Sequence, residues 1–538
     1  MNLTTCTPTP QAASSALAQE NAWLREQVKR LQHQLDWFKK QLFGPKSERQ
    51  VFDLAEQGEL FQAADASTAQ ASQAPQEEEK RSVRSYQRGT AKKQRDEDCL
   101  NATGLRFTAD VPVQVVQNLP PELTGPNADQ YEIIGTKTTY RLAQQAASYL
   151  VIQHERPVFR LKGVDNKPVT TAAAFNVLDN SLADVSLLAG LLVDKFQFHL
   201  PLYRQHQRIQ QAGITVSRST LTNLVKRSID LLRPIVDAQT DSILRSRVLA
   251  MDETPIKAGH QKRPGAQKGK MKSGWFWPMY GDADEVVFTY SNSRGKLHIE
   301  QVLKSQFSGT LISDGYAAYA RYVAAQKNIT HAQCWVHSRR YFIEAQKEHP
   351  EKATEALQQI AKLYQNEATI KKLGLSGQKK HQYRQDHTQP LVSHFFQWCQ
   401  GQLENCGLLP SDPLSKALNY VLKREASLSV FLEDPDVQPD TNHLERTLRP
   451  IPLGRKNWLF CWTELGAEHL GIIQSLISTC KLHDLNPYTY LVDVLQRISQ
   501  HPASKVNELT PRLWKERFAD NPLRALIDPR HPQRQSSL

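Results

Sequence analysis

The spacing of hydrophobic residues changes several times along the chain, and each change predicts a different kind of element. Between Leu17 and Leu42 the apolar positions alternate in steps of four and three, the heptad pattern of a coiled coil. We expect a leucine-rich helix over residues 1–50 that pairs protomers; the alternative is one amphipathic helix packed on its own chain. The core positions of the repeat are Asn21, Leu24, Val28, Leu31, Leu35, Phe38 and Leu42.

The apolar pattern then fades and returns as short β-like runs. Residues 51–100 are rich in Ala, Gln, Ser and charged side chains, so this segment buries too little apolar surface to become ordered and is predicted to be a disordered linker. Residues 101–165 contain β-branched and aromatic runs, with a break at Pro157, and predict a small β-rich module.

A helical period begins near Val185 and predicts a helical module over residues 180–245. Two helices meet at Ala212-Gly213-Ile214, and the second begins near Ser217, an arrangement similar to a helix-turn-helix. We expect this module to bind DNA; the alternative is an ordinary helical hairpin. Its candidate contacts to phosphates or base edges are Arg204, Arg208, Arg218, Lys226 and Arg227.

Two aspartates stand directly after strand-like runs in residues 246–345. Asp252 follows the apolar run 248–251, and Asp314 follows the run 309–313. Two further strand-like runs and a helix lie between them, so the order is strand, strand, strand, helix, strand. If the strands that end in the two aspartates are neighbours in a sheet, both carboxylates emerge at the same edge. A carboxylate at the end of a buried strand needs a compensating partner, such as a metal ion.

A third acid, Glu445, lies near the start of a helix that Asp440 or Thr441 can cap, after the helical region 346–436. Three carboxylates can hold two Mg²⁺ ions about 4 Å apart, which activate the attacking oxygen and stabilise the leaving oxygen. Oxygen ligands suit Mg²⁺, with Mn²⁺ as a substitute, and no Cys/His cluster predicts zinc for this role. Alternatively, each aspartate is a turn or cap residue and the glutamate forms a surface ion pair with a neighbouring arginine.

Several motifs of the chain resemble those of one transposase family. They are MDET at 251–254, SDGYAAY at 313–319, CWVHSRRYF at 334–342, DTNHLERTLRPIPLGRKNWLF at 440–460, QLFGPKSER at 41–49, HLPLYRQ at 199–205 and HDLNPYTYLVDVLQRISQHP at 483–502. Together they are similar to the insertion sequence 66 family of bacterial DDE transposases. The resemblance implies a ribonuclease H-like core whose catalytic, metal-binding acids match Asp252, Asp314 and Glu445.

The expected fold is an α/β multidomain chain whose catalytic core is a mixed sheet flanked by helices. The expected parts are the catalytic domain at 246–345 and 437–480, a helical insertion at 346–436, and a C-terminal helical segment and tail at 481–538. The chain departs from the family in two respects. The third-acid motif reads DTNHLER, where family sequences more often have small residues around the Asn. Family members usually carry a Cys-based zinc module after the linker, whereas only Cys99 lies nearby here, so we expect no zinc.

The overall charge favours a polyanionic partner. Lys and Arg number 67 against 55 Asp and Glu, a formal net charge of +12 over 538 residues. A run of cations without any acid follows Asp252 and is expected to form a loop that meets a phosphate backbone beside the metals; the alternative is a solvated hairpin. The cations of this run are Lys257, Lys262, Arg263, Lys268, Lys270 and Lys272.

Further polar and aromatic residues surround the second and third acids in sequence. Cys334 is expected to be a core thiol and His337 a polar group near the site. Trp458 and Trp462 either stack on an unpaired base at a DNA end or pack in the core. The remaining candidate DNA contacts are His337, Arg339, Arg340, Arg446, Arg449, Arg455 and Lys456.

These features predict a transposase that binds the terminal repeats of an insertion sequence and target DNA. The protein would nick the element end and then use the new 3′-hydroxyl to attack target DNA. We expect a homodimer or higher oligomer and allow for accessory element-encoded proteins. One alternative is a catalytically silent protein that pairs DNA ends; another is a nuclease that cuts but never joins.

The sequence predicts a cytoplasmic, nucleoid-associated bacterial protein. No stretch approaches about 18 consecutive apolar residues, and the first residues lack the basic and apolar regions of a secretory signal. The seven cysteines are scattered without any CxxC pair, which fits a reducing compartment.

Overall fold

The computed structural model describes residues 105–107, 111–145, 148–162, 169–170, 175–261, 270–304, 306–405, 407–528 and 530. The predicted coiled coil of residues 1–50 and the linker 51–100 lie outside the described residues, as do Lys262, Arg263 and Lys268. All described residues belong to one unit of the chain, Lys92–Leu538.

A mixed six-stranded sheet holds the two aspartates. Its strands are β7 (Val248–Met251), β8 (Thr254–Gln261), β9 (Lys270–Gly281), β10 (Val286–Ser291), β11 (Gly309–Ser313) and β12 (Ile329–Gln333). The order is β10-β9-β7-β11-β12, and β8 pairs with β9 outside this path. β7, β11 and β12 are parallel, whereas β9 runs antiparallel to both β7 and β10. Every residue of β7 is buried, which explains its unbroken apolar run.

The sequence pattern did not predict strand β8. Its residues include Pro, Gly, Lys and His, so the segment lacks a strand-like alternation, and its pairing with β9 supplies the order instead. Lys257 and Lys272 therefore lie on paired strands and not in the predicted loop. The register shifts between Lys257 and His260, where Gly259 adopts a φ of 73° that favours glycine.

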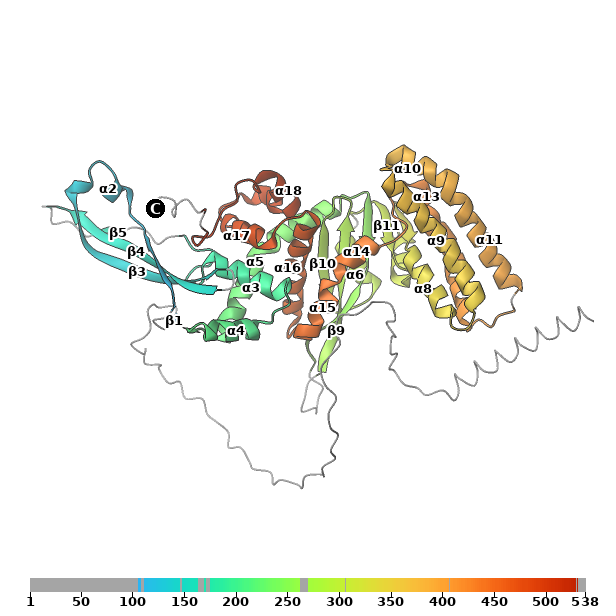
Figure 1. Ribbon diagram of the computed structural model, residues 1–538, viewed down its shortest axis with the longest axis horizontal. Helices are drawn as coiled ribbons and strands as arrows, with labels where there is room; N and C mark the ends of the chain where they lie inside the picture. The colour runs from blue at the N-terminus through green and yellow to red at the C-terminus, as the bar shows by residue number, and fades with distance from the viewer. Residues whose placement is uncertain are drawn as a thin grey trace, which may run out of the picture. The chain divides into compact units, whose positions relative to one another are not determined.

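Helices from distant parts of the chain pack on this sheet or on the helices that cover it. They are α3 (Val185–Phe196), α4 (Leu202–Gln211), α5 (Arg218–Ile243), α6 (Lys296–Leu303), α7 (Ala317–Val323), α14 (Asn442–Leu448), α15 (Pro450–Trp458), α16 (Glu464–Leu482), α17 (Pro487–Arg497), η3 (Ala503–Leu509) and α18 (Pro511–Arg517). Figure 1 shows α5 and α16 beside β10, with α14 and α15 in front of the strands. The apolar faces of α5 and α16 pack together and against β10.

Helix α16 covers β10, the strand at the edge of the sheet. The N–H of Phe288 donates to Ser475 Oγ at 2.9 Å, and the N–H of Val286 donates to Thr479 Oγ1 at 3.2 Å. The helix and strand approach closely at Gly471, where an added Cβ would lie 2.4 Å from the carbonyl oxygen of Phe288. These contacts satisfy backbone groups that an open edge would offer to another chain.

Residues 202–243, which were predicted to resemble a helix-turn-helix, have a short strand between the two helices in place of a simple turn. Between α4 and α5 lies a short strand, β6 (Ile214–Thr215), which pairs with β1 (Arg106–Phe107). The Ser217 hydroxyl caps α5 by accepting from the N–H of Thr220 at 3.0 Å. Helix α5 is 26 residues long in total. It packs on α4 and also on β9 and β10, so one helix connects this region to the central sheet.

A second sheet lies in the predicted β-rich region. Its order is β2-β4-β3, with β5 paired to β4. Its elements are β2 (Val113–Gln117), α2 (Pro121–Thr124), η1 (Ala128–Gln130), β3 (Tyr131–Gln145), β4 (Ser148–Leu161) and β5 (Val169–Thr170). The predicted break at Pro157 is wrong, because β4 runs through it. Pairing between β2 and β4 ends at Glu155, so the missing N–H of Pro157 is not needed on that side.

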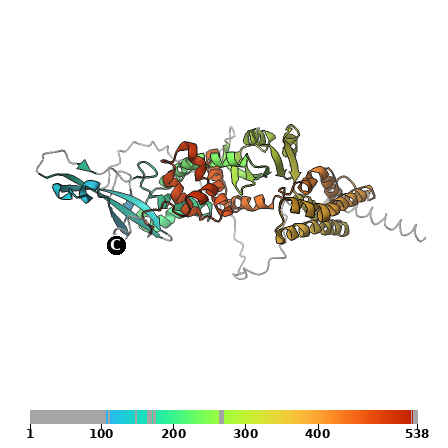
Figure 2. The same cartoon turned by 90° about the horizontal axis from the view of Figure 1, so that it is seen from above.

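Between β12 and α14 the chain is helical. The elements are α8 (Trp335–Ala345), α9 (Pro350–Lys372), α10 (Gly377–Tyr383), η2 (Arg384–Thr388), α11 (Gln389–Asn405), α12 (Pro413–Leu422) and α13 (Glu425–Glu433). Aromatic side chains form much of the core here, including Trp335, whose ring lies 5.6 Å from that of Phe395. Figure 2, seen from above, shows these helices next to the sheet on the side away from α17.

Candidate active site

Two aspartates emerge at the same edge of the central sheet. β7 and β11 are parallel, with Leu249 opposite Leu311, and each strand ends one residue before its aspartate. Asp252 Oδ1 accepts from the N–H of Glu253 at 2.7 Å, and Asp314 Oδ1 accepts from the N–H of Tyr316 at 2.8 Å. Both carboxylates are thereby oriented by the turn that follows the strand.

Helix α14 is fixed to this edge by contacts at its start. The N–H of Trp335 donates to the Pro439 carbonyl at 2.9 Å, and the N–H of Thr441 donates to Cys334 Sγ at 3.4 Å. These bonds join the start of α14 to the end of β12, the strand next to β11. Glu445 lies in the first turn of α14, with its side chain 31% exposed. No described arginine or lysine pairs with Glu445, so the alternative of a surface ion pair with a neighbouring arginine is not realised in the described chain.

The pKa of Asp252 is affected by the other acids of the site. Burial raises the pKa of Asp252 to about 7, and the negative charges of Glu253, Asp314 and Glu445 act in the same direction. The hydrogen bond from the N–H of Glu253 opposes this rise. Three acids from separate parts of the sequence therefore influence one another through space.

His337 faces this acidic cluster from α8. Its Nε2 lies 4.0 Å from Glu445 Oε1, and its side chain is only 13% exposed. Burial lowers the pKa of His337, as does Arg340, whereas Asp314 and Glu445 oppose that change. His337 therefore fits the prediction of a polar group beside the acids. It fits less well the prediction of a contact to a DNA phosphate, because its side chain is mostly buried.

The structure adds Glu253, which the sequence did not single out. Its side chain is 2% exposed, and it accepts hydrogen bonds from Arg294 Nε and from the Tyr319 hydroxyl, both at 2.9 Å. Burial raises the pKa of Glu253, and Asp314 adds to this effect, while Arg294 and Tyr319 oppose it. Glu253 is thus a fixed negative charge beside Asp252, and its only sequence signal is the acidic pair in MDET.

The candidate DNA contacts divide into two groups. Arg208 pairs with Asp194, Arg227 donates to the Asp179 carbonyl at 3.0 Å, and Arg455 donates to a carbonyl of β8. These three guanidinium groups are held by the protein, and Lys270 is the first residue of β9. The candidates with exposed side chains are Arg204, Arg218, Lys226, Arg339, Arg340, Arg446, Arg449 and Lys456.

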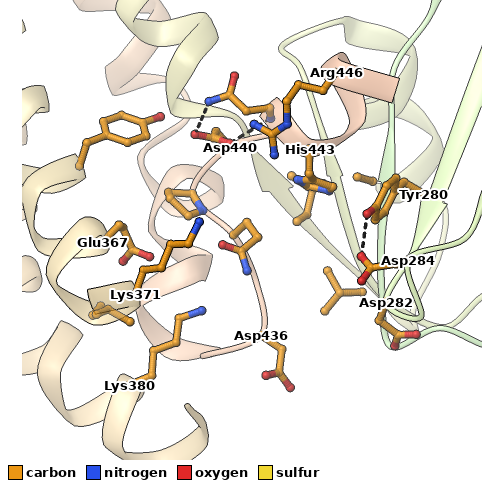
Figure 3. A pocket seen from close by; sticks show the side chains of 18 of the residues that line it. Tyr280, Asp282, Asp284, Glu367, Lys371, Lys380, Asp436, Asp440, His443 and Arg446 are labelled. Carbon is orange, nitrogen blue, oxygen red and sulfur yellow. Dashed lines mark hydrogen bonds between the residues drawn. The ribbon is translucent and has the colours of Figure 1, made fainter. Parts of the chain in front are cut away.

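A cavity of about 970 Å³ opens against another face of α14 (Figure 3). His443 packs edge-on against Tyr280 there, with ring centroids 4.8 Å apart, and Lys371 and Lys380 extend from the insertion. Its lining includes Asp440 and Arg446 but none of the three candidate catalytic acids. Asp252 and Asp314 instead follow the ends of β7 and β11, and Glu445 lies in the first turn of α14, all outside this cavity.

Within the described part of the chain, no three His, Cys, Asp or Glu side chains are grouped closely enough to hold a metal ion as they stand. The donor chemistry at the strand ends nevertheless fits a hard divalent cation, because it consists of carboxylate oxygens whose charges repel one another. Among the described helices, none is long and apolar enough to cross a membrane.

Comparison with known families decides the classification. The sequence profile described as "Transposase IS66 family" matches residues 180–469, which include Asp252, Asp314 and Glu445. This chain belongs to the IS66 transposase family. The profile of the "IS66 C-terminal element" matches residues 475–512 of this family member, and "Transposase C of IS166 homeodomain" matches residues 30–99, outside the described residues. The resemblance found in the motifs is confirmed.

Curated relatives of this IS66 family member include proteins of Sinorhizobium fredii (strain NBRC 101917 / NGR234). "Uncharacterized protein y4hP" is 30% identical over 430 residues, 76% of each chain. "Uncharacterized protein y4jD" is 31% identical over 397 residues, 71% of this chain and 76% of the relative. A solved structure, "Drosophila P element transposase strand transfer complex", matches 57% of this chain and 93% of its own at 11% identity, with a TM-score of 0.30.

Proposed function

We propose that this IS66 family member cuts DNA at the ends of an insertion sequence and joins those ends to target DNA. The observation that carries the proposal is that the parallel strands β7 and β11 end next to each other, directly before Asp252 and Asp314. The raised pKa of Asp252, to which burial and the charges of Asp314 and Glu445 contribute, supports it. Acidic side chains that repel one another in a half-exposed site favour a divalent cation, since the ion would remove the repulsion. The mixed sheet that carries them is, in this proposal, the ribonuclease H-like core that the family resemblance implies.

The metal in this proposal is Mg²⁺, with Mn²⁺ as a substitute, held as two ions by Asp252, Asp314 and Glu445. When bound, such ions activate an attacking oxygen and stabilise a leaving oxygen at phosphorus. The chain supplies the rest of the site. Asp252 must lose its proton to bind a cation, and Glu253 stays committed to Arg294 and Tyr319 as a fixed charge.

DNA is the polyanion that the net charge of +12 would attract. Arg449, the residue directly after α14, is exposed four residues beyond Glu445, and Arg339 and Arg340 are exposed on α8 close to His337 in sequence. Phosphate contacts there would position a strand over the acids. We further propose that residues 1–50 pair protomers so that two DNA ends are held together.

The first test is cleavage of DNA that carries the element's own ends. With Mg²⁺ or Mn²⁺ we expect the wild-type chain to cut at the ends and to join the cut ends to a target plasmid. Asp252→Ala should lower cleavage by at least about 10³-fold while leaving DNA binding within about twofold, because it removes a metal ligand and no DNA contact.

Asp520→Ala is the matched control, since Asp520 is an exposed acid in the C-terminal segment. It should cut and join as the wild type does. Undiminished cleavage by the Asp252→Ala protein would overturn the proposed chemistry. Cleavage without joining would instead identify a nuclease.

A further inference from the structure

The turn between α15 and α16 exposes more apolar surface than a solvated turn requires. Trp462 is 68% exposed and Leu459 is 65% exposed. Three other tryptophans are almost completely buried: Trp277 is 0%, Trp335 1% and Trp514 2% exposed. The sequence left core packing and base stacking open for Trp462, and this exposure excludes core packing. An exposed indole of this kind is typical of a binding surface.

The backbone of this turn is strained at Leu459. Its φ is 64° and its ψ is −54°, and the N–H of Phe460 donates to the carbonyl of Trp458 at 2.7 Å. This is a three-residue γ-turn with positive φ at a non-glycine residue, a conformation that costs energy and persists only where the surroundings impose it. Such strain concentrates at functional sites.

The surroundings that impose the turn are the edge of β8. The N–H of Cys461 donates to the Lys257 carbonyl at 2.9 Å, and the N–H of Gly259 donates to the Cys461 carbonyl at 3.1 Å. The segment after α15 therefore pairs with β8 at Cys461. This pairing fixes the direction in which the next side chain, Trp462, leaves the surface.

Three aromatic rings assemble at this place. The ring centroid of Trp462 lies 5.4 Å from that of His260, with 31° between the planes, and 5.1 Å from that of Phe460, with 79° between the planes. We call Phe460, Trp462 and His260 the aromatic platform. The neighbouring rings hold the indole while most of its surface stays exposed, so a ligand would find it preorganised.

Positive charge accompanies the aromatic platform. The exposed Lys456 lies in the last turn of α15, and the exposed Lys257 lies on β8, three residues before His260. The acid at the start of α16, Glu464, is paired with Lys272 at 2.8 Å. A flat aromatic surface beside unneutralised cations is the combination that binds single-stranded nucleic acid, with stacking for the base and cations for the phosphate.

We infer that the aromatic platform binds an unpaired nucleobase of the DNA end that the acids process. This inference rests on the proposed transposase function. A base offers its flat face only when it is unpaired or terminal, so the ligand is single-stranded or frayed DNA and not the interior of a duplex. Asp252 and His260 are eight residues apart, which is at most about 27 Å of extended chain, and the Trp462 ring lies 5.4 Å from that of His260. At about 3.4 Å per nucleotide, the stacked base lies within about ten nucleotides of the phosphate at Asp252.

The test compares DNA binding by full-length Trp462→Ala with the wild type, in EDTA so that no cleavage occurs. The probes are a fluorescein-labelled 20-nucleotide poly-dT strand, a blunt duplex, and the same duplex with an unpaired tail. We expect Trp462→Ala to weaken binding of the poly-dT strand and the tailed duplex by about 5- to 150-fold, and binding of the blunt duplex by less than about twofold.

Trp462→Tyr should restore most of the lost affinity, since it returns an aromatic face. Leu373→Ala is the matched control, because Leu373 is 59% exposed at the end of α9. It should bind all three probes as the wild type does. A tail substituted with 2-aminopurine at successive positions should show strong quenching at a single nucleotide near the duplex junction.

Equal affinity of Trp462→Ala and the wild type for the tailed duplex would overturn the inference. So would loss of self-association in Trp462→Ala with unchanged DNA affinity, which would mark the surface as a protein interface. If the wild type fails to cut element ends but still prefers tailed DNA through Trp462, the platform stands and the proposed chemistry falls.

Discussion

At the scale of the residue, the ionisation of Asp252 depends on the adjacent Glu253. The sequence motif alone does not show that these two acids have different roles. Asp252 and Glu253 are adjacent, yet Glu253 is tied by Arg294 and Tyr319 while Asp252 faces the other acids. The fixed charge of Glu253 is one cause of the raised pKa of Asp252, after burial. Glu253 therefore affects the pH at which Asp252 can bind a cation.

We expect Glu253→Gln to shift the acid limb of metal-dependent cleavage to lower pH. The pKa of Asp252 is about 7, so the cation-binding ionised form is lost as the pH falls through that value. Removing a neighbouring negative charge lowers this pKa, and the ionised form then persists to lower pH. The measurement is cleavage rate against pH in Mn²⁺, with Glu300→Gln on α6 as a control that should leave the limb in place. A limb that stays fixed or moves to higher pH in Glu253→Gln contradicts the role assigned to Glu253.

At the scale of elements, one arginine joins the insertion to the segment that leads into α14. Arg384 lies in η2, a single π-helical turn, and is 0% exposed. Its Nε and one terminal nitrogen each donate to the Glu367 carboxylate at 2.8 Å. Its other terminal nitrogen donates to the carbonyls of Phe431, Asp434 and Val437 at 2.5, 3.2 and 3.0 Å. The segment that precedes Asp440 is thereby anchored in the insertion.

Arg384→Met should lower the free energy of unfolding by about 3–5 kcal/mol, because it leaves a mostly buried carboxylate and three carbonyls without this donor. Arg384→Met with Glu367→Leu should recover part of this loss, since the unpaired charge is removed as well. Urea denaturation followed by circular dichroism measures both. Lys379→Met, at an exposed position in α10, is the control and should change stability by less than about 0.5 kcal/mol. A similarly small effect of Arg384→Met would show that the anchor is dispensable.

At the scale of the whole molecule, histidines buried in separate parts of the fold make stability depend on pH. Burial lowers the pKa of His154 on β4, His298 on α6 and His331 on β12 to about 4 each. His298 Nε2 lies 3.0 Å from Thr289 Oγ1, and His331 Nε2 lies 2.9 Å from Ser313 Oγ. These interactions are compatible with the neutral ring in the folded state.

Stability should therefore fall as the pH drops from about 6.5 to about 4. In this window the unfolded histidines take up protons while the folded ones do not, so protonation favours unfolding by up to about 3 kcal/mol for each ring. Thermal unfolding across this range should show the loss, and His298→Gln should make the dependence on pH shallower. His394→Gln, at an exposed position on α11, should leave the slope unchanged. Equal slopes for the wild type and His298→Gln would exclude this cause.

The sequence by itself determined what depends on local pattern. The apolar runs that deliver Asp252 and Asp314 are strands, because a run buried on both faces reads as continuous hydrophobicity. The motifs around the acids identified the family, since they are long enough to be specific. Helical periodicity likewise located the helices between β12 and α14.

Only the tertiary structure decided how distant segments meet. β8 is a strand because β9 pairs with it, although its own residues lack a strand pattern. Glu253 is buried and Trp462 exposed, but neighbours distant in sequence set both outcomes: Arg294 and Tyr319 for Glu253, and the edge of β8 for Trp462. Periodicity records which face of an element is apolar, and it carries no information on which remote groups will cover that face.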